Sequence, residues 1–166
     1  MAASARVRKV ALVVHVGASV GWLGAVFCFL ALALVGVTGS DPGAVRGVYL
    51  VMEPLAWFTL VPLAFASLVT GLVQSWVTPW GLLRHYWVLF KLGITVVCTG
   101  VLLLYTRTFE TMAQAAASDL PIESVRNASP VLHALLALLA LAAATVLSVF
   151  KPKGVTRRGQ RVPRQG

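Results

Sequence analysis

The hydrophobic positions of this chain fall into four long runs that are separated by short, more polar segments. The runs cover residues 10–37, 55–77, 86–105 and 131–150. A hydrocarbon core of about 30 Å needs about 20 apolar residues in an α-helix. Each run therefore predicts one membrane-spanning helix. We expect an all-α fold, an integral membrane four-helix bundle formed as a single domain by residues 1–150.

Composition supports a membrane protein over a soluble one. Of the 166 residues, 58% are hydrophobic and 11% are charged, whereas a soluble domain has about a quarter of its residues charged. The segment 151–166 differs from the rest because it is basic and rich in Pro and Gly. We predict that it is a disordered tail.

The net charge of +9 has a one-sided distribution along the chain. Basic residues precede the first run, lie between the second and third, and follow the fourth: Arg6, Arg8, Lys9, Arg84, Lys151, Lys153, Arg157, Arg158, Arg161 and Arg164. The positive-inside rule then predicts a multi-pass membrane protein with both termini in the cytoplasm. We expect the tail to bind anionic lipid and expect no nucleic-acid partner.

Helical periodicity gives each predicted helix a polar or small face. In the first run, His15, Ser19 and Trp22 share one stripe at helical spacing. The opposite stripe carries glycines at the same spacing: Gly17, Gly21 and Gly24. Small residues four apart let helix backbones approach closely in lipid, so a homo- or hetero-oligomer is a possible partner state.

The most informative residues are the ionisable ones inside the apolar runs, because polar groups at membrane depth are costly and mark functional sites. Counting from the cytoplasmic ends at 1.5 Å per residue puts His15 and Lys91 both about 8–9 Å inside. Gln74 and Arg84 belong to the same inner half. His133 enters from the opposite side and so belongs to the outer half.

This inner set suggests a specific chemistry. A neutral imidazole is a good axial ligand for haem iron, so His15 is the candidate metal ligand. Lys91 can hold an anionic group or, in a low dielectric, lose its proton and act as a base, which makes it the candidate catalytic residue. Trp22 is a candidate for stacking on a cofactor ring, and Gln74 and Arg84 complete the candidate cofactor site. The inner half holds no carboxylate to balance these cations, and this favours a bound anionic ligand.

Structural alternatives stand beside each of these roles. His15 can hydrogen-bond a carbonyl of a neighbouring helix, and Lys91 can extend its stem to the interface. Arg84 and His85 can be interface residues, and His133 can be a cap near the outer surface.

Two stretches of the sequence carry a resemblance to known families. Residues 15–24 and 81–92 resemble a family of actinobacterial membrane proteins of unknown function, the DUF2269-like proteins. More distantly, His15 with Trp22 seven residues later, and Trp87 with Lys91, are similar to the HemJ-type protoporphyrinogen oxidases and to CopD-like membrane domains. That likeness implies functional roles for His15 and Lys91 and haem b as the cofactor. The sequence departs from the pattern at residues 103–105, where a histidine would supply a second ligand.

Three functions follow as hypotheses. The first is a haem-binding or redox-linked membrane protein with His15 and Lys91 in the inner half. The second is a small transport component, and the third is a structural partner subunit of a larger membrane complex. Whether the chain is an enzyme is left open by the sequence.

Overall fold

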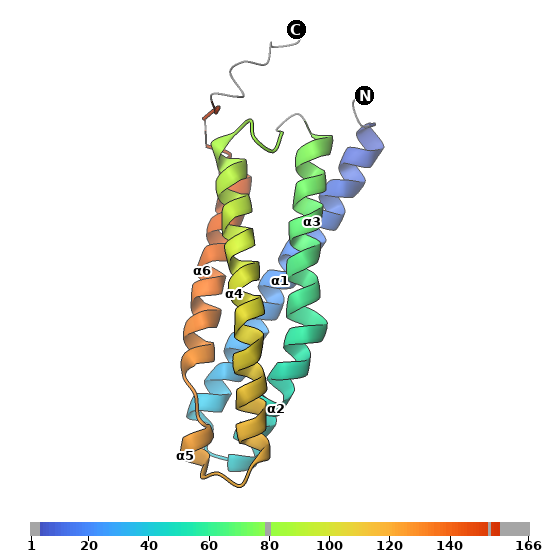
Figure 1. Cartoon of the computed structure of the whole chain (residues 1–166). Helices are drawn as coiled ribbons and strands as arrows, with labels where there is room; N and C mark the ends of the chain where they lie inside the picture. The colour runs from blue at the N-terminus through green and yellow to red at the C-terminus, as the bar shows by residue number, and fades with distance from the viewer. Residues whose placement is uncertain (1–3, 79–80, 153, 157–166) are drawn as a thin grey trace.

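The computed structural model describes residues 4–78, 81–152 and 154–156 and is helical almost throughout (Figure 1). Its elements, in chain order, are α1 (Ala5–Thr38), α2 (Pro42–Leu55), the π-helical turn η1 (Ala56–Leu60), α3 (Val61–Val77), α4 (Tyr86–Ala117), α5 (Ile122–Val125) and α6 (Ser129–Phe150).

Four of the resulting rods are long and apolar enough to cross a membrane, judged by length and composition. They cover Ala5–Thr38, Pro42–Val77, Tyr86–Ala117 and Ile122–Phe150. The prediction of an all-α fold with four long apolar helices is therefore confirmed.

The rods are longer than the apolar runs predicted, because segments expected to be loops are helical. Asp41 accepts hydrogen bonds from the backbone N–H groups of Gly43 and Ala44, and Pro42 occupies the first turn of α2. These residues, which look like turn signals in the sequence, form a helix N-cap followed by the proline that such a position favours. The segment 109–117 lies beyond the predicted run 86–105 and forms the end of α4.

The helix α2 continues into α3 through η1 rather than ending at a loop. Pro62 lies in the first turn of α3 and has no N–H to donate to the preceding turn. A π-helical turn directly before it is one of the known ways in which a helix accommodates such a break. As a result, one continuous rod of 36 residues replaces the predicted loop and helix.

The four rods form a bundle in which α1 contacts α3 and α6, and α4 contacts the same two helices. The helices α1 and α4 therefore face each other across the diagonal. Both chain termini lie at one end of the bundle, which we call the terminal end (Figure 1). The opposite end, where α2 and α5 lie, is called the far end.

The best-packed part of the core lies toward the far end. The rings of Phe29 and Phe109 meet edge-on with centroids 5.6 Å apart, and Tyr105 packs on Phe109 at 5.0 Å. Tyr49 is fully buried, and its hydroxyl donates to the carbonyl of Asn127 and accepts from the Asn127 N–H at 2.9 Å. This paired contact fastens α2 to the segment before α6.

Two arginines close helix ends at the far end of the bundle. Each guanidinium donates to three backbone carbonyls that the end of a helix would otherwise leave unpaired. The acceptors are Gly36, Val37 and Gly39 for Arg126, at the end of α1, and Ala116, Ser118 and Leu120 for Arg46, at the end of α4. These basic side chains thus have a local structural role.

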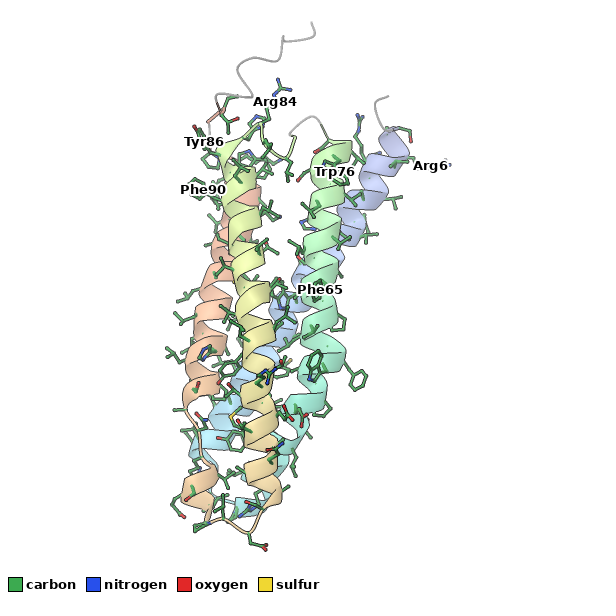
Figure 2. The ribbon with its side chains drawn as sticks, viewed as in Figure 1. Arg6, Phe65, Trp76, Arg84, Tyr86 and Phe90 are labelled. Atoms are coloured by element: carbon green, nitrogen blue, oxygen red, sulfur yellow. The ribbon has the colours of Figure 1, made fainter. Side chains whose placement is uncertain are left out.

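At the terminal end, large aromatic side chains face outward. Figure 2 shows Trp76 on α3 and Tyr86 and Phe90 on α4, and all three are exposed. The amphipathic rings of Trp76 and Tyr86 are typical of the belts that membrane proteins place at the lipid–water interface. Trp87, by contrast, lines an internal pocket.

We predict that Gly36→Ala destabilises the bundle, because a Cβ at position 36 would lie 2.9 Å from the buried ring of Tyr49. Overpacking of this kind costs about 1–3 kcal/mol. The midpoint of thermal unfolding in detergent should fall. Gly24→Ala is the matched control on the same helix, because nothing lies within 4 Å of the added methyl group there. An equal midpoint for the two variants would contradict the tight packing of α1 against Tyr49.

Candidate functional site

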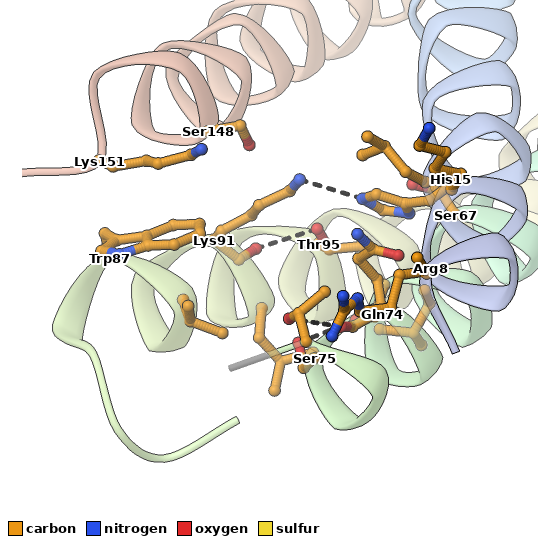
Figure 3. A pocket seen from close by; sticks show the side chains of 18 residues that line it. Arg8, His15, Ser67, Gln74, Ser75, Trp87, Lys91, Thr95, Ser148 and Lys151 are labelled. Atoms are coloured by element: carbon orange, nitrogen blue, oxygen red, sulfur yellow. Dashed lines mark hydrogen bonds between the residues drawn. The ribbon is translucent and has the colours of Figure 1, made fainter. Parts of the chain in front are cut away.

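A pocket of about 580 Å³ opens at the terminal end between α1, α3, α4 and the end of α6 (Figure 3). Its volume falls in the range of sites for small molecules and cofactors. Four cationic side chains line it, namely Arg8, Lys9, Lys91 and Lys151. Among the described lining residues there is no aspartate or glutamate, so the pocket carries a one-signed charge.

At the centre of the pocket, Lys91 Nζ lies 3.0 Å from His15 Nε2. The two residues come from α1 and α4, which are diagonal in the bundle. Only long side chains can span that separation, and Figure 3 shows them reaching toward each other. His15 is 7% exposed and Lys91 is half-buried, so the contact is part-buried and lies in the pocket wall.

Hydrogen bonds around His15 determine which ring nitrogen carries the proton. The hydroxyl of Thr70 donates to the carbonyl of Ala66 in the preceding helical turn. Its oxygen therefore accepts from His15 Nδ1, which lies 3.0 Å away. With the proton on Nδ1, the Nε2 lone pair points into the pocket and accepts from the amine of Lys91. The lone pair that would bind a metal is thus directed into the pocket and is engaged by Lys91 in this structure.

The imidazole ring of His15 packs against the helix α3. Gly71 lies so close that a Cβ there would be 3.1 Å from His15 Cε1. Nearby, the hydroxyls of Ser19 and Ser67 are 2.9 Å apart and join α1 to α3. Small and hydroxylated residues on this face of α3 therefore fix the position of the ring, which is the role that partners behind a ligating histidine usually have.

Gln74 adds an unusual feature to the pocket wall. Its Oε1 atom is buried and has no hydrogen-bond partner among the residues that the structure describes. A buried acceptor without a donor is uncommon in folded proteins and calls for an explanation such as a bound water or ligand. A ligand with a donor group would satisfy it.

The structure separates the predicted site residues into two groups. His15, Gln74 and Lys91 line one pocket, whereas Trp22 and Arg84 do not. Trp22 is 2% exposed and belongs to the hydrophobic core. Arg84 lies in the connection before α4, where its carbonyl accepts from the Thr156 N–H at 3.0 Å.

His133 occupies a different place altogether. Its ring stacks on Tyr105 with centroids 4.1 Å apart, and its Nδ1 lies 2.9 Å from the carbonyl of Ser129. Tyr105 is 14 residues after Lys91 on α4, so this cluster is about 21 Å along the helix from the pocket. The two histidines therefore serve different ends of the bundle.

The residues that directly follow α6 are paired, whereas the disorder predicted for 151–166 as a whole stays a prediction. Residues 154–156 pair with residues 84–86: the Tyr86 N–H donates to the carbonyl of Gly154, and Val155 bridges to His85. The hydroxyl of Thr156 also donates to the carbonyl of Leu83. Lys153 and residues 157–166 lie outside the described residues. The pairing, together with Lys151 in the pocket wall, was missed by sequence reasoning because two-residue backbone contacts leave no periodic signal.

Comparisons of the chain with protein-family models, curated proteins and solved structures find no match. What can be said of function therefore comes from the pocket's own residues.

Those residues are better suited to a metal held in a porphyrin than to a metal ion bound by side chains alone. The described residues contain no group of three or more His, Cys, Asp or Glu side chains that could hold a metal ion by themselves. One oriented imidazole is, however, the donor that an iron porphyrin takes from a protein. Cations at the same pocket are suited to the acidic groups of such a ligand.

We predict that neutral His15 is the tautomer protonated at Nδ1, and that Thr70→Val disturbs it by removing the acceptor. Nitrogen-15 NMR of labelled histidine in detergent distinguishes the two ring nitrogens. Thr145→Val is a matched control, since the Thr145 hydroxyl donates only to the Leu141 carbonyl of its own helix in the described structure. A native His15 protonated at Nε2, or a spectrum unchanged by Thr70→Val, would contradict this assignment.

Proposed function

We propose that this chain is a haem-binding or redox-linked protein of the bacterial plasma membrane, with His15 as the axial ligand of haem b. The carrying observation is the buried imidazole whose Nε2 lone pair is directed into a cation-lined pocket by the Thr70 hydrogen bond. The likeness of His15, Trp22, Trp87 and Lys91 to the HemJ and CopD patterns supports the same reading.

The residues present fit such a cofactor in three respects. His15 has one nitrogen held by Thr70 and the other available for iron. Lys91 has a flexible stem, so its amine can leave Nε2 and pair with an acidic group. Gln74 lines the same wall, and its side-chain amide N–H groups are donors of the kind that an acidic group accepts.

Haem, when bound, supplies one-electron chemistry whose potential the protein tunes. The chain's own part is to orient the imidazole, to exclude water and to hold a proton near the site. Lys91 is the residue placed to give or accept that proton, and this is its proposed catalytic role. Thr95 assists, because its hydroxyl bonds the Lys91 carbonyl and fills the wall beside the amine.

We further propose that the terminal end faces the cytoplasm. Arg6, Arg8 and Lys9 on α1 and Lys151 after α6 lie at this end, as the positive-inside rule requires of the cytoplasmic side. At the far end, Arg46 and Arg126 are engaged by helix-end carbonyls. The pocket then opens to the cytoplasm and its acidic ligand enters from there or from the inner leaflet.

A second candidate function, a partner subunit of a larger complex, is favoured by a separate observation. Four glycines on α1 and α4 have open space where a Cβ would lie: Gly17, Gly24, Gly93 and Gly100. At these positions the helix surface has no side chain, so another transmembrane helix can approach closely. A transport path is less favoured, since Ser67 and Thr70 of α3 are occupied in hydrogen bonds with α1.

The test is an optical spectrum of the purified protein from haem-replete cells, oxidised and dithionite-reduced. We expect a Soret band and reduced α and β bands of a b-type haem. His15→Ala should abolish them, and His133→Ala, which removes the stacked histidine of the far end, should leave them in place. A colourless native protein, or bands lost only in His133→Ala, would overturn the proposal.

A further inference from the structure

The mouth of the pocket combines three cations from opposite ends of the chain. Arg8 and Lys9 come from the first turns of α1, and Lys151 follows the last residue of α6. Figure 3 shows Lys151 and Arg8 on different sides of the pocket, with Lys91 between them. The described residues that line the pocket include no carboxylate, and like charges repel one another, so a bound anion would stabilise this arrangement.

Lys151 has a backbone conformation that lysine seldom adopts. Its φ is +43°, in the left-handed region, at the end of α6. Glycine is the usual residue there, because it lacks the Cβ that makes this conformation unfavourable. A lysine at this position gives up local stability and gains a cationic side chain in the pocket wall.

The paired segment that follows holds Lys151 in place. We call residues 154–156 the C-terminal strap. It is bonded to the connection between α3 and α4 through both its backbone and the Thr156 hydroxyl. Because the strap is attached just after α6 ends, it fixes the direction in which the chain leaves the helix. That direction places Lys151 at the pocket.

We infer that Arg8, Lys9 and Lys151 form an acid-binding mouth, which holds the acidic group of an amphiphilic ligand while the apolar body of the ligand lies in the pocket beneath. The strap is the positioning element for Lys151. The inference rests on the proposed function in that it concerns the same pocket, but it assigns the class of ligand by its acid group and not by its iron. A cofactor carboxylate and a lipid phosphate share this chemistry.

The probe that separates the acid from the ring is metal-free protoporphyrin IX, compared with its dimethyl ester. The two have the same apolar ring, and only the first carries carboxylates. Binding to the full-length protein is measured by porphyrin fluorescence in nanodiscs of phosphatidylcholine, with empty nanodiscs correcting for partition into lipid. We expect the acid to bind about tenfold more tightly than the ester, as one charge-assisted contact provides.

Variants at the mouth test the role of each part. Lys151→Gly should weaken binding of the acid by about tenfold while the protein unfolds at the same or a higher temperature, since glycine suits the left-handed position. Lys151→Arg should retain binding. Thr156→Val, which removes the strap's hydroxyl bond, should give a smaller loss. Arg107→Gln, at an exposed cation near the far end, is the control and should bind as the native protein does.

A second set of nanodiscs containing phosphatidylglycerol identifies the source of the anion. If the lipid competes with protoporphyrin IX in the native protein and not in Lys151→Gly, the mouth exists and a lipid phosphate occupies it. The inference is overturned if acid and ester bind equally, or if Lys151→Gly binds the acid as tightly as the native protein. A colourless protein with acid-selective porphyrin binding would refute the haem proposal alone, whereas a His15-dependent haem without acid selectivity would refute the mouth alone.

Discussion

The hydrogen bond between Lys91 and His15 is the interaction on which the terminal end of this bundle depends. A lysine amine in an apolar environment needs an acceptor, because lipid supplies none. In the described structure that acceptor is an imidazole nitrogen from the diagonally opposite helix. The contact therefore joins two helices, α1 and α4, that do not pack directly on each other, and it does so inside the pocket.

The contact also determines what else is needed nearby. An imidazole that accepts at Nε2 has to donate at Nδ1, and this calls for the hydroxyl of Thr70. The ring then requires space against α3, which is available because position 71 is a glycine. Lys91, His15 and Thr70 thus form a chain of hydrogen bonds in which each side chain supplies a hydrogen-bond partner for its neighbour.

The two ends of the bundle differ in how tightly they are packed and in how well their polar groups are paired. The far end is packed with aromatic rings and closed by arginines on helix-end carbonyls, so it behaves as a rigid base. The terminal end keeps a cavity, cationic side chains and a buried unpaired oxygen on Gln74. Local stability is thus concentrated away from the site, and the site keeps the unsatisfied groups that binding requires.

Hydropathy alone was sufficient to predict four long helices, because a run of about 20 apolar residues has few other solutions. Counting residues from one side also put His15 and Lys91 at the same depth. It could not give their direct contact, since hydropathy does not show which side chains of two diagonal helices reach each other. Trp22 shows a second gap: it shares the buried stripe of α1 with His15 but is packed in the hydrophobic core, about two turns further along the helix and away from the pocket.

The prediction of a loop around Asp41 was wrong for a different reason. Asp41, Pro42 and Gly43 favour both turns and helix starts, and only the contacts of Asp41 with the following N–H groups decide between them. The pairing of the C-terminal strap could not be predicted from the sequence either, because it joins residues 154–156 to residues 84–86, about seventy residues earlier in the chain.

The uninterrupted rod formed by α2, η1 and α3 has a consequence for how far the molecule would project from a bilayer. Trp57 and Trp76 are both exposed on this rod and are 19 residues apart (76 − 57), which corresponds to about 28 Å of helix. A bilayer whose two interfaces coincide with these tryptophans leaves the 14 residues of α2 beyond it, a projection of about 21 Å. The molecule then carries a stiff helical headpiece in place of flexible surface loops, and that headpiece offers neighbouring molecules a surface of fixed shape.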